Sequence, residues 1–83
     1  MLHTVTLQLS IVQPVATQKE RAAEIITATR AASRVATTQH CTTIQWDLHR
    51  PDEALYVLNK VYTFIVDAGI KFEFISLEPA REL

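Results

Sequence analysis

Apolar and polar residues alternate along the first part of the chain. Between Val5 and Ile11 every second residue is apolar, and the residues between them are threonine, glutamine or serine. A period of two places all the apolar side chains on one face of a β-strand. This segment is therefore predicted to be a strand buried on one side only. Pro14 has no backbone N–H and is expected to end the ladder.

A helix is predicted to begin at Thr17, because the segment Thr17–Glu20 has the residue types and spacing of a capping box. In this signal the Thr hydroxyl accepts a hydrogen bond from a backbone amide of the first turn, and the Glu side chain reaches back. Helical spacing predicts the inward residues Ala22, Ile25, Ile26, Ala28 or Thr29, and Ala32. The outer face is predicted to carry Glu20, Glu24, Thr27, Arg30 and Arg34.

The next segment allows two interpretations. Residues 42–48 alternate cleanly and predict a strand with Trp46 buried against the second helix, around Leu58 and Tyr62. Residues 34–38 are rich in β-branched side chains and fit a short strand, joined to 42–48 by a tight turn near 39–41. Alternatively, the first helix continues to about Thr38.

The second helix has clear signals at both ends. Pro51 is followed by two acids, as is typical of a first helical turn, and Gly69 is placed to end the helix. Its predicted inward residues are Leu55, Leu58, Val61, Tyr62, Ile65 and Ala68. A last strand is predicted from Ile70, with Ile70, Phe72 and Phe74 on its apolar face, and Pro79 begins a short charged tail, 79–83.

These elements predict an α+β fold of the ferredoxin-like, split βαβ type. Three or four amphipathic strands and two amphipathic helices each have one apolar side, so the economical packing is an antiparallel sheet of three to four strands with both helices on one face. Residues 1–83 form a single domain in this prediction, without a linker or an internal repeat.

Composition narrows the classes of function. The 83 residues are 48% hydrophobic and carry a formal charge of −1, which is not the basic balance of a nucleic-acid-binding domain. A single cysteine excludes an internal disulfide and favours the cytoplasm. The N-terminus lacks the continuous apolar run of a signal peptide, and no segment is long enough to span a membrane. With Gly69 as its only glycine, the chain has no phosphate-binding loop, and no cofactor is expected.

The element order, strand–helix–strand–strand–helix–strand, resembles the small ACT-type regulatory modules, which include small subunits that regulate amino-acid biosynthetic enzymes. The resemblance covers most of the chain and implies a regulatory module. Those modules usually hold an amino acid at a Gly-containing turn after the first strand, whereas the turn Val12–Thr17 has no glycine. The same order also resembles dimeric α+β-barrel enzymes such as muconolactone isomerases and small monooxygenases, whose His-bearing strands are similar to those of His3 and His40 here.

Few residues suggest catalytic or metal chemistry. Asp47 and His49, two positions apart at the end of a strand, are the candidate catalytic pair, since a carboxylate can orient an imidazole base. A solvated strand end is the plainer interpretation. His40, Cys41 and His49 are too few and too divergent for a metal site, because neighbouring strand residues point to opposite faces. No metal is expected.

Two surfaces are candidates for binding. Arg30 and Arg34 are predicted one turn apart on the first helix. They could meet an acidic partner or a nucleic-acid backbone, or form an ordinary solvated face. The second surface is the open face of the sheet, which combines neutral polar residues with two apolar residues at one rim. Its predicted members are Thr4, Thr6, Gln8, Ser10, Thr43, Gln45, Asp47, Lys71, Glu73, Ile75 and Leu77.

Neutral side chains on this face favour association, because a surface that only had to be soluble would carry more Lys and Glu. Thr6, Gln8, Thr43, Gln45, Ile75 and Leu77 are therefore predicted to form a homodimer interface. Alternatively, edge strands of the sheet pair between the two subunits. The first hypothesis is a non-catalytic binding or regulatory module that forms a homodimer and modulates a partner protein. The alternative is a small dimeric α+β-barrel enzyme, which would need Asp47 and His49, or His3, to converge in a pocket.

Overall fold

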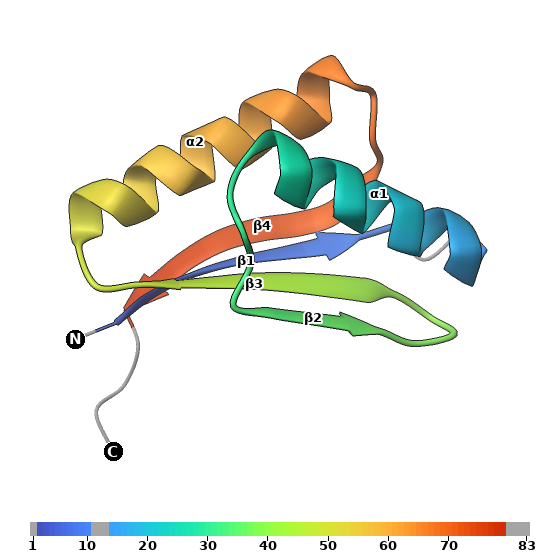
Figure 1. The fold of residues 1–83 in the computed structure, drawn as a ribbon, viewed down its shortest axis with the longest axis horizontal. Coiled ribbons are helices and arrows are strands. Elements are labelled where there is room, and N and C mark those ends of the chain that lie inside the picture. The colour runs from blue at the N-terminus through green and yellow to red at the C-terminus, as the bar shows by residue number, and fades with distance from the viewer. Residues whose placement is uncertain (1, 11–13, 80–83) are drawn as a thin grey trace.

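The computed structural model describes residues 2–10 and 14–79 of the chain. Its elements are β1 (His3–Leu9), α1 (Val15–Ala28), β2 (Arg34–Thr37), β3 (Thr42–Leu48), α2 (Pro51–Asp67) and β4 (Phe72–Pro79). The four strands form one antiparallel sheet, and both helices cover the same face of it (Figure 1). The chain thus has the predicted α+β ferredoxin-like fold. The predicted strand residue Ile11 and tail residues 80–83 lie outside the described residues.

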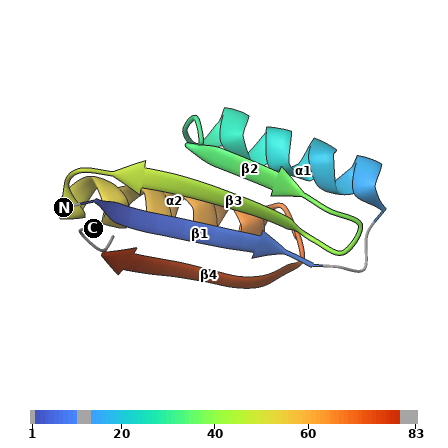
Figure 2. The same cartoon turned by 90° about the horizontal axis from the view of Figure 1, so that it is seen from below.

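The strand order is β2-β3-β1-β4, which places β1 in the interior and leaves β2 and β4 at the edges (Figure 2). Val5 lies opposite Trp46, and Leu7 lies opposite Ile44. All four side chains are buried under the helices, as the alternation in β1 and β3 predicts. Because residues 34–37 form an edge strand, the interpretation that continues the first helix to Thr38 is wrong.

The turn between β2 and β3 is organised by a hydroxyl group. Thr38 Oγ1 accepts hydrogen bonds from the backbone N–H groups of His40 and Cys41, at 3.1 and 3.2 Å. The Thr38 N–H donates to the Cys41 carbonyl, which closes the hairpin. A threonine side chain here replaces the Gly or Asn that commonly marks a tight turn.

The first helix differs from its prediction at both ends. It begins at Val15 after Pro14, without a side-chain cap, so the capping box at Thr17 does not form. It ends at Ala28, and the Thr29 hydroxyl donates to the Ile25 carbonyl in the last turn. Because the chain leaves the helix before Arg30, that residue and Arg34 do not share a helical face. Arg34 is instead the first residue of β2.

The second helix begins at Pro51 with Asp52 and Glu53 in its first turn, as predicted. It ends in a Schellman motif, in which Gly69 has a φ of +68° and the N–H of Ile70 donates to the Ile65 carbonyl. Its buried residues are Ala54, Val57, Val61 and Ile65. The prediction that Leu55, Tyr62 and Ala68 point inward is wrong, because all three are exposed.

A β-bulge changes which face the residues of β4 occupy. Gln8 pairs with Phe74 but Leu9 pairs with Phe72, so Glu73 is an extra residue in β4. Beyond the bulge Ile75 pairs with Leu7 and Leu77 pairs with Val5, which places both side chains on the helix side, against the core. The prediction that Ile75 and Leu77 lie on the open face is therefore wrong. Phe74, predicted to be inward, lies on the open face instead.

Trp46 is fully buried, and its indole N–H donates to the Arg30 carbonyl at 2.9 Å. The burial is confirmed, but Tyr62 is not part of that core. Two polar side chains are also buried. Thr42 Oγ1 lies 2.8 Å from Gln18 Oε1 and 3.2 Å from Thr37 Oγ1. Because the hydroxyl has one proton, it donates to the Gln18 oxygen and accepts from Thr37, which ties α1 to β3 and β2.

Candidate functional site

The open face of the sheet is the surface that no element of the described chain covers (Figure 2). The register orders its side chains in three rows that run across the strands. The first row is Asp47, Thr4 and Glu78, the second is Arg34, Gln45, Thr6 and Ser76, and the third is Ala36, Thr43, Gln8 and Phe74. The four polar residues predicted from the sequence, Thr6, Gln8, Thr43 and Gln45, are thus confirmed as central neighbours on this face.

The acidic group on β3 of this face is held by neighbours on the sheet. Asp47 Oδ1 accepts a hydrogen bond from the Thr4 hydroxyl at 2.9 Å, and Arg34 lies 3.6 Å from Asp47 Oδ2. The Asp47 side chain is about one quarter exposed, whereas Arg34 is two thirds exposed. The positive charge of Arg34 and the negative charge of Asp47 neutralise each other at this end of the sheet. The middle of the face is neutral because its residues, Thr6, Gln8, Thr43 and Gln45, carry no charge.

Phe74 gives this face an exposed aromatic ring, 44% accessible, beside Gln8. Sequence reasoning missed it, because regular alternation from Ile70 predicts the opposite face for this residue. The signal that could have found it is the run Phe72-Glu73-Phe74-Ile75, in which two apolar residues are adjacent. A single extra residue in a strand is one way to accommodate such a pair.

The structure does not assemble the proposed catalytic groups. Asp47 contacts Thr4 and Arg34, while His49 is an exposed residue beyond the end of β3. His3 pairs with Leu48 and shares the helix side with Val5, across the sheet from Asp47. Among the described residues, then, the convergence that the enzymatic alternative requires is missing.

The other sequence candidates are also separated. His40 lies exposed in the β2–β3 turn beside the half-buried Cys41, and no group of three or more potential metal ligands occurs in the described part of the chain. Arg30 lies in the connection after α1, 3.9 Å from Glu53 of α2. Arg30 therefore lies on the helix side of the molecule, and Arg34 lies on the open face.

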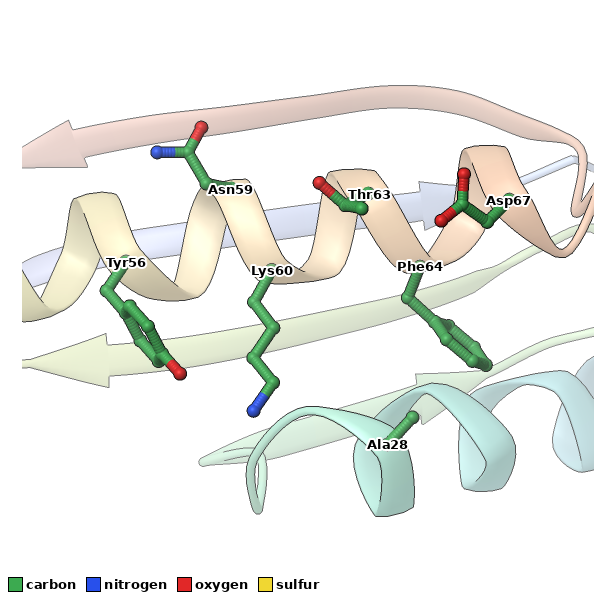
Figure 3. Close-up of a pocket in the computed structure, with 7 residues that line it drawn as sticks. All are labelled: Ala28, Tyr56, Asn59, Lys60, Thr63, Phe64 and Asp67. Carbon is green, nitrogen blue, oxygen red and sulfur yellow. The ribbon is translucent and has the colours of Figure 1, made fainter.

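A shallow groove of about 490 Å³ runs between the two helices (Figure 3). Phe64 and Lys60 point from α2 toward α1, and the Lys60 ammonium lies 5.6 Å from the centre of the Tyr56 ring. The groove is lined by Ala28, Tyr56, Asn59, Lys60, Thr63, Phe64 and Asp67. The groove is open to solvent. Its lining residues include one lysine, one aspartate and uncharged side chains, and no nucleophile among them is paired with a base.

Comparisons of the chain with models of protein families, with curated proteins and with solved structures find no match. Within the described ranges, 2–10 and 14–79, no helix has the length and apolar character needed to cross a membrane.

Proposed function

We propose that the protein is a non-catalytic binding module that associates with itself. It binds and modulates a partner protein through the open face of its sheet. The observation that carries this proposal is the neutral centre of that face, formed by Thr6, Gln8, Thr43 and Gln45. The exposed side of α1, in contrast, carries charged side chains such as the Arg21–Glu24 pair. The resemblance in element order to ACT-type regulatory modules supports a regulatory role, and the composition supports the cytoplasm.

The chemistry of the face suits a protein partner. Short hydroxyl and amide side chains can pair with a partner's polar groups, and Phe74 adds an aromatic anchor at one side. Arg34 ends the second row on the edge strand β2, and Glu78 ends the first row on the opposite edge strand β4. These two charges therefore lie at the rim of the face. A neutral centre with charges at the rim is the usual arrangement of a protein interface.

The test compares two threonine substitutions that each add one lysine. Thr6→Lys places a charge at the centre of the face, where its neighbours Gln45 and Ser76 are neutral. Thr27→Lys adds the same charge on the exposed side of α1 and is the matched control. Tagged wild-type protein and Thr27→Lys should recover one common partner from the native host, and Thr6→Lys should lose it.

The recovered partner must also change its activity or assembly when purified wild-type protein is added. Thr43→Lys, a second variant on the face, guards against a local folding defect in Thr6→Lys, and circular dichroism reports the fold of each variant. Full partner recovery by folded Thr6→Lys and Thr43→Lys would remove the open face as the binding surface. A turnover of a small molecule that depends on His49 would refute the non-catalytic proposal.

A further inference from the structure

An apolar surface lies along the β4 side of the molecule, apart from the open face. On α2 the side chains of Leu55, Tyr62 and Val66 are each about half exposed. At 100° per residue they share one flank of the helix, opposite the flank from which Lys60 and Phe64 point toward α1 (Figure 3). The Tyr62 ring meets the Phe72 ring of β4 edge to face, with centroids 6.3 Å apart. The apolar flank of α2 therefore runs beside the free edge of β4.

On its free edge, β4 has backbone N–H and C=O groups that form no hydrogen bonds within the sheet. The Ser10 N–H donates to the Lys71 carbonyl, so the even-numbered residues of β1 direct their backbone toward β4. Their partners Phe74, Ser76 and Glu78 complete this ladder. The N–H and C=O groups of Ile75 and Leu77 consequently point away from the sheet. Pro79 occupies an outward position too, where a missing N–H is tolerated.

We propose that a second copy of this chain docks on this flank, with the two β4 strands pairing antiparallel across a two-fold axis. This inference rests on the proposed self-association and names the surface that carries it. In the register that uses both outward residues, Ile75 pairs with Leu77 of the partner subunit, and Ser76 lies on the axis. Each of Ile75 and Leu77 then donates and accepts a backbone hydrogen bond, and Pro79 is left outside the paired segment.

The same two-fold axis also brings the α2 helices of the two copies into contact. The helix α2 contacts β4 and β1 most extensively and β3 less, so its axis lies toward the β1–β4 side of the sheet. With strands about 4.8 Å apart, two copies related through β4 bring their α2 helices to about 10 Å, the distance at which helices pack. Asn59 is the middle residue of Pro51–Asp67. An axis near Asn59 places Leu55 against Tyr62 of the partner subunit, and the reverse.

The charge and the area of this flank are both compatible with binding of a second copy of the chain. Leu55, Asn59, Tyr62 and Val66 on α2, and Ile75, Ser76 and Leu77 on β4, are all uncharged, so no like charges meet on the axis. The flank is as long as the 17-residue helix α2, about 25 Å, and the strand and helix layers together are about 20 Å deep. Each copy thus contributes about 500 Å² in projection, and side-chain relief brings the pair to the roughly 1,200 Å² of specific interfaces.

The dimer has a consequence for the partner protein. Pairing at β4 joins the two sheets into one of eight strands, with all four helices on the same side. The two open faces then form a single surface, and the Phe74 rings lie on either side of the axis. Self-association and partner binding therefore use different surfaces of the molecule.

A cysteine cross-link and a charge substitution test the β4 interface, both measured on the full chain. In a Cys41→Ser background, Ser76→Cys should form an intermolecular disulfide under mild oxidation, because opposed residues on the axis lie about 4.5–5.5 Å apart. Gln45→Cys is the control, since the β3 strands of the two copies are five strand spacings, about 24 Å, apart. Tyr62→Glu should convert the dimer to monomer, whereas Tyr56→Glu, on the other flank of α2, should leave it intact.

The outcomes separate this inference from the proposed function. A cross-link at Ser76→Cys, with loss of the dimer in Tyr62→Glu only, supports the β4 interface. A dimer that cross-links through Gln45→Cys and survives Tyr62→Glu overturns the β4 interface but keeps self-association. A wild-type protein that is monomeric overturns both. Because Tyr62 also contacts Phe72, circular dichroism must show that Tyr62→Glu is folded, and the cross-link is an independent readout.

Discussion

Trp46 illustrates how one residue joins three parts of the fold. It lies opposite Val5 in the sheet, it is buried under the helices, and its indole N–H satisfies the carbonyl of Arg30 in the connection after α1. This last hydrogen bond holds the chain where it turns from α1 toward β2. The alternation in residues 42–48 predicts the burial, but the partner of the indole N–H depends on where α1 ends.

Replacement of Trp46 should separate packing from hydrogen bonding. Trp46→Ala removes the largest fully buried side chain and should lower the free energy of unfolding by about 3–5 kcal/mol. Trp46→Phe keeps a ring but leaves the Arg30 carbonyl without its donor, and should cost about 1–3 kcal/mol. Urea unfolding followed by circular dichroism measures both. Equal losses in the two variants would show that the hydrogen bond, not the packing, dominates.

The buried Gln18–Thr42 contact gives a second test at this scale. Thr42→Val keeps the shape of the side chain but removes the donor to Gln18 Oε1, and should cost about 1–3 kcal/mol. Thr43→Val changes the same residue type on the open face and is the control, with an expected effect below about 0.5 kcal/mol. Equal stability of the two variants in urea would contradict the buried network.

At the scale of elements, sequence periodicity predicts the type and order of five of the six elements. It fails where the backbone is irregular. The sequence allows two interpretations for β2, because only four residues form the strand and the Thr38 hydroxyl, not a Gly or Asn, marks its turn. Periodicity predicts a longer α1 than the structure has, because Ala and Arg near residue 30 are good helix formers, whereas the helix ends at Ala28. The bulge at Glu73 then reverses the faces of Ile75 and Leu77, which are the two members of the candidate interface that sequence placed wrongly.

The bulge makes adjacent residues of β4 respond in opposite ways to the same change. Ile75→Lys puts a charge against the core and should cost about 3 kcal/mol or more. Phe74→Lys changes an exposed residue on the open face and should stay within about 1 kcal/mol of the wild-type stability. Thermal unfolding of both proteins is the measurement. A more damaging Phe74→Lys would show that β4 continues without a bulge, as simple alternation predicts.

The turn between β2 and β3 can be tested by removing one hydroxyl. Thr38→Ala deletes the acceptor for the His40 and Cys41 amides and should cost about 0.5–1.5 kcal/mol. Thr38→Asn offers a carbonyl in a similar place and should retain most of the stability. Faster amide exchange at His40 and Cys41 in Thr38→Ala would locate the loss in the turn, and unchanged exchange would contradict this role of the hydroxyl.

At the scale of the whole molecule, two helices on one side of a four-stranded sheet leave one face and two edges open. The neutral centre of the face could be predicted from the sequence, because β1 and β3 alternate regularly. The apolar flank formed by α2 and β4 could not, because Leu55 and Tyr62 fit a helical core pattern equally well. A chain of 83 residues has a small core, so burial of such surfaces between copies is an effective source of stability.

The central claim is that the chain associates with itself, and the mass of the wild-type protein in solution tests it most directly. Light scattering coupled to size exclusion at about 100 μM, a concentration that reveals even modest affinities, should give about 19 kDa, twice the 9.4 kDa of one chain. A mass of 9.4 kDa at the highest concentration would contradict the claim.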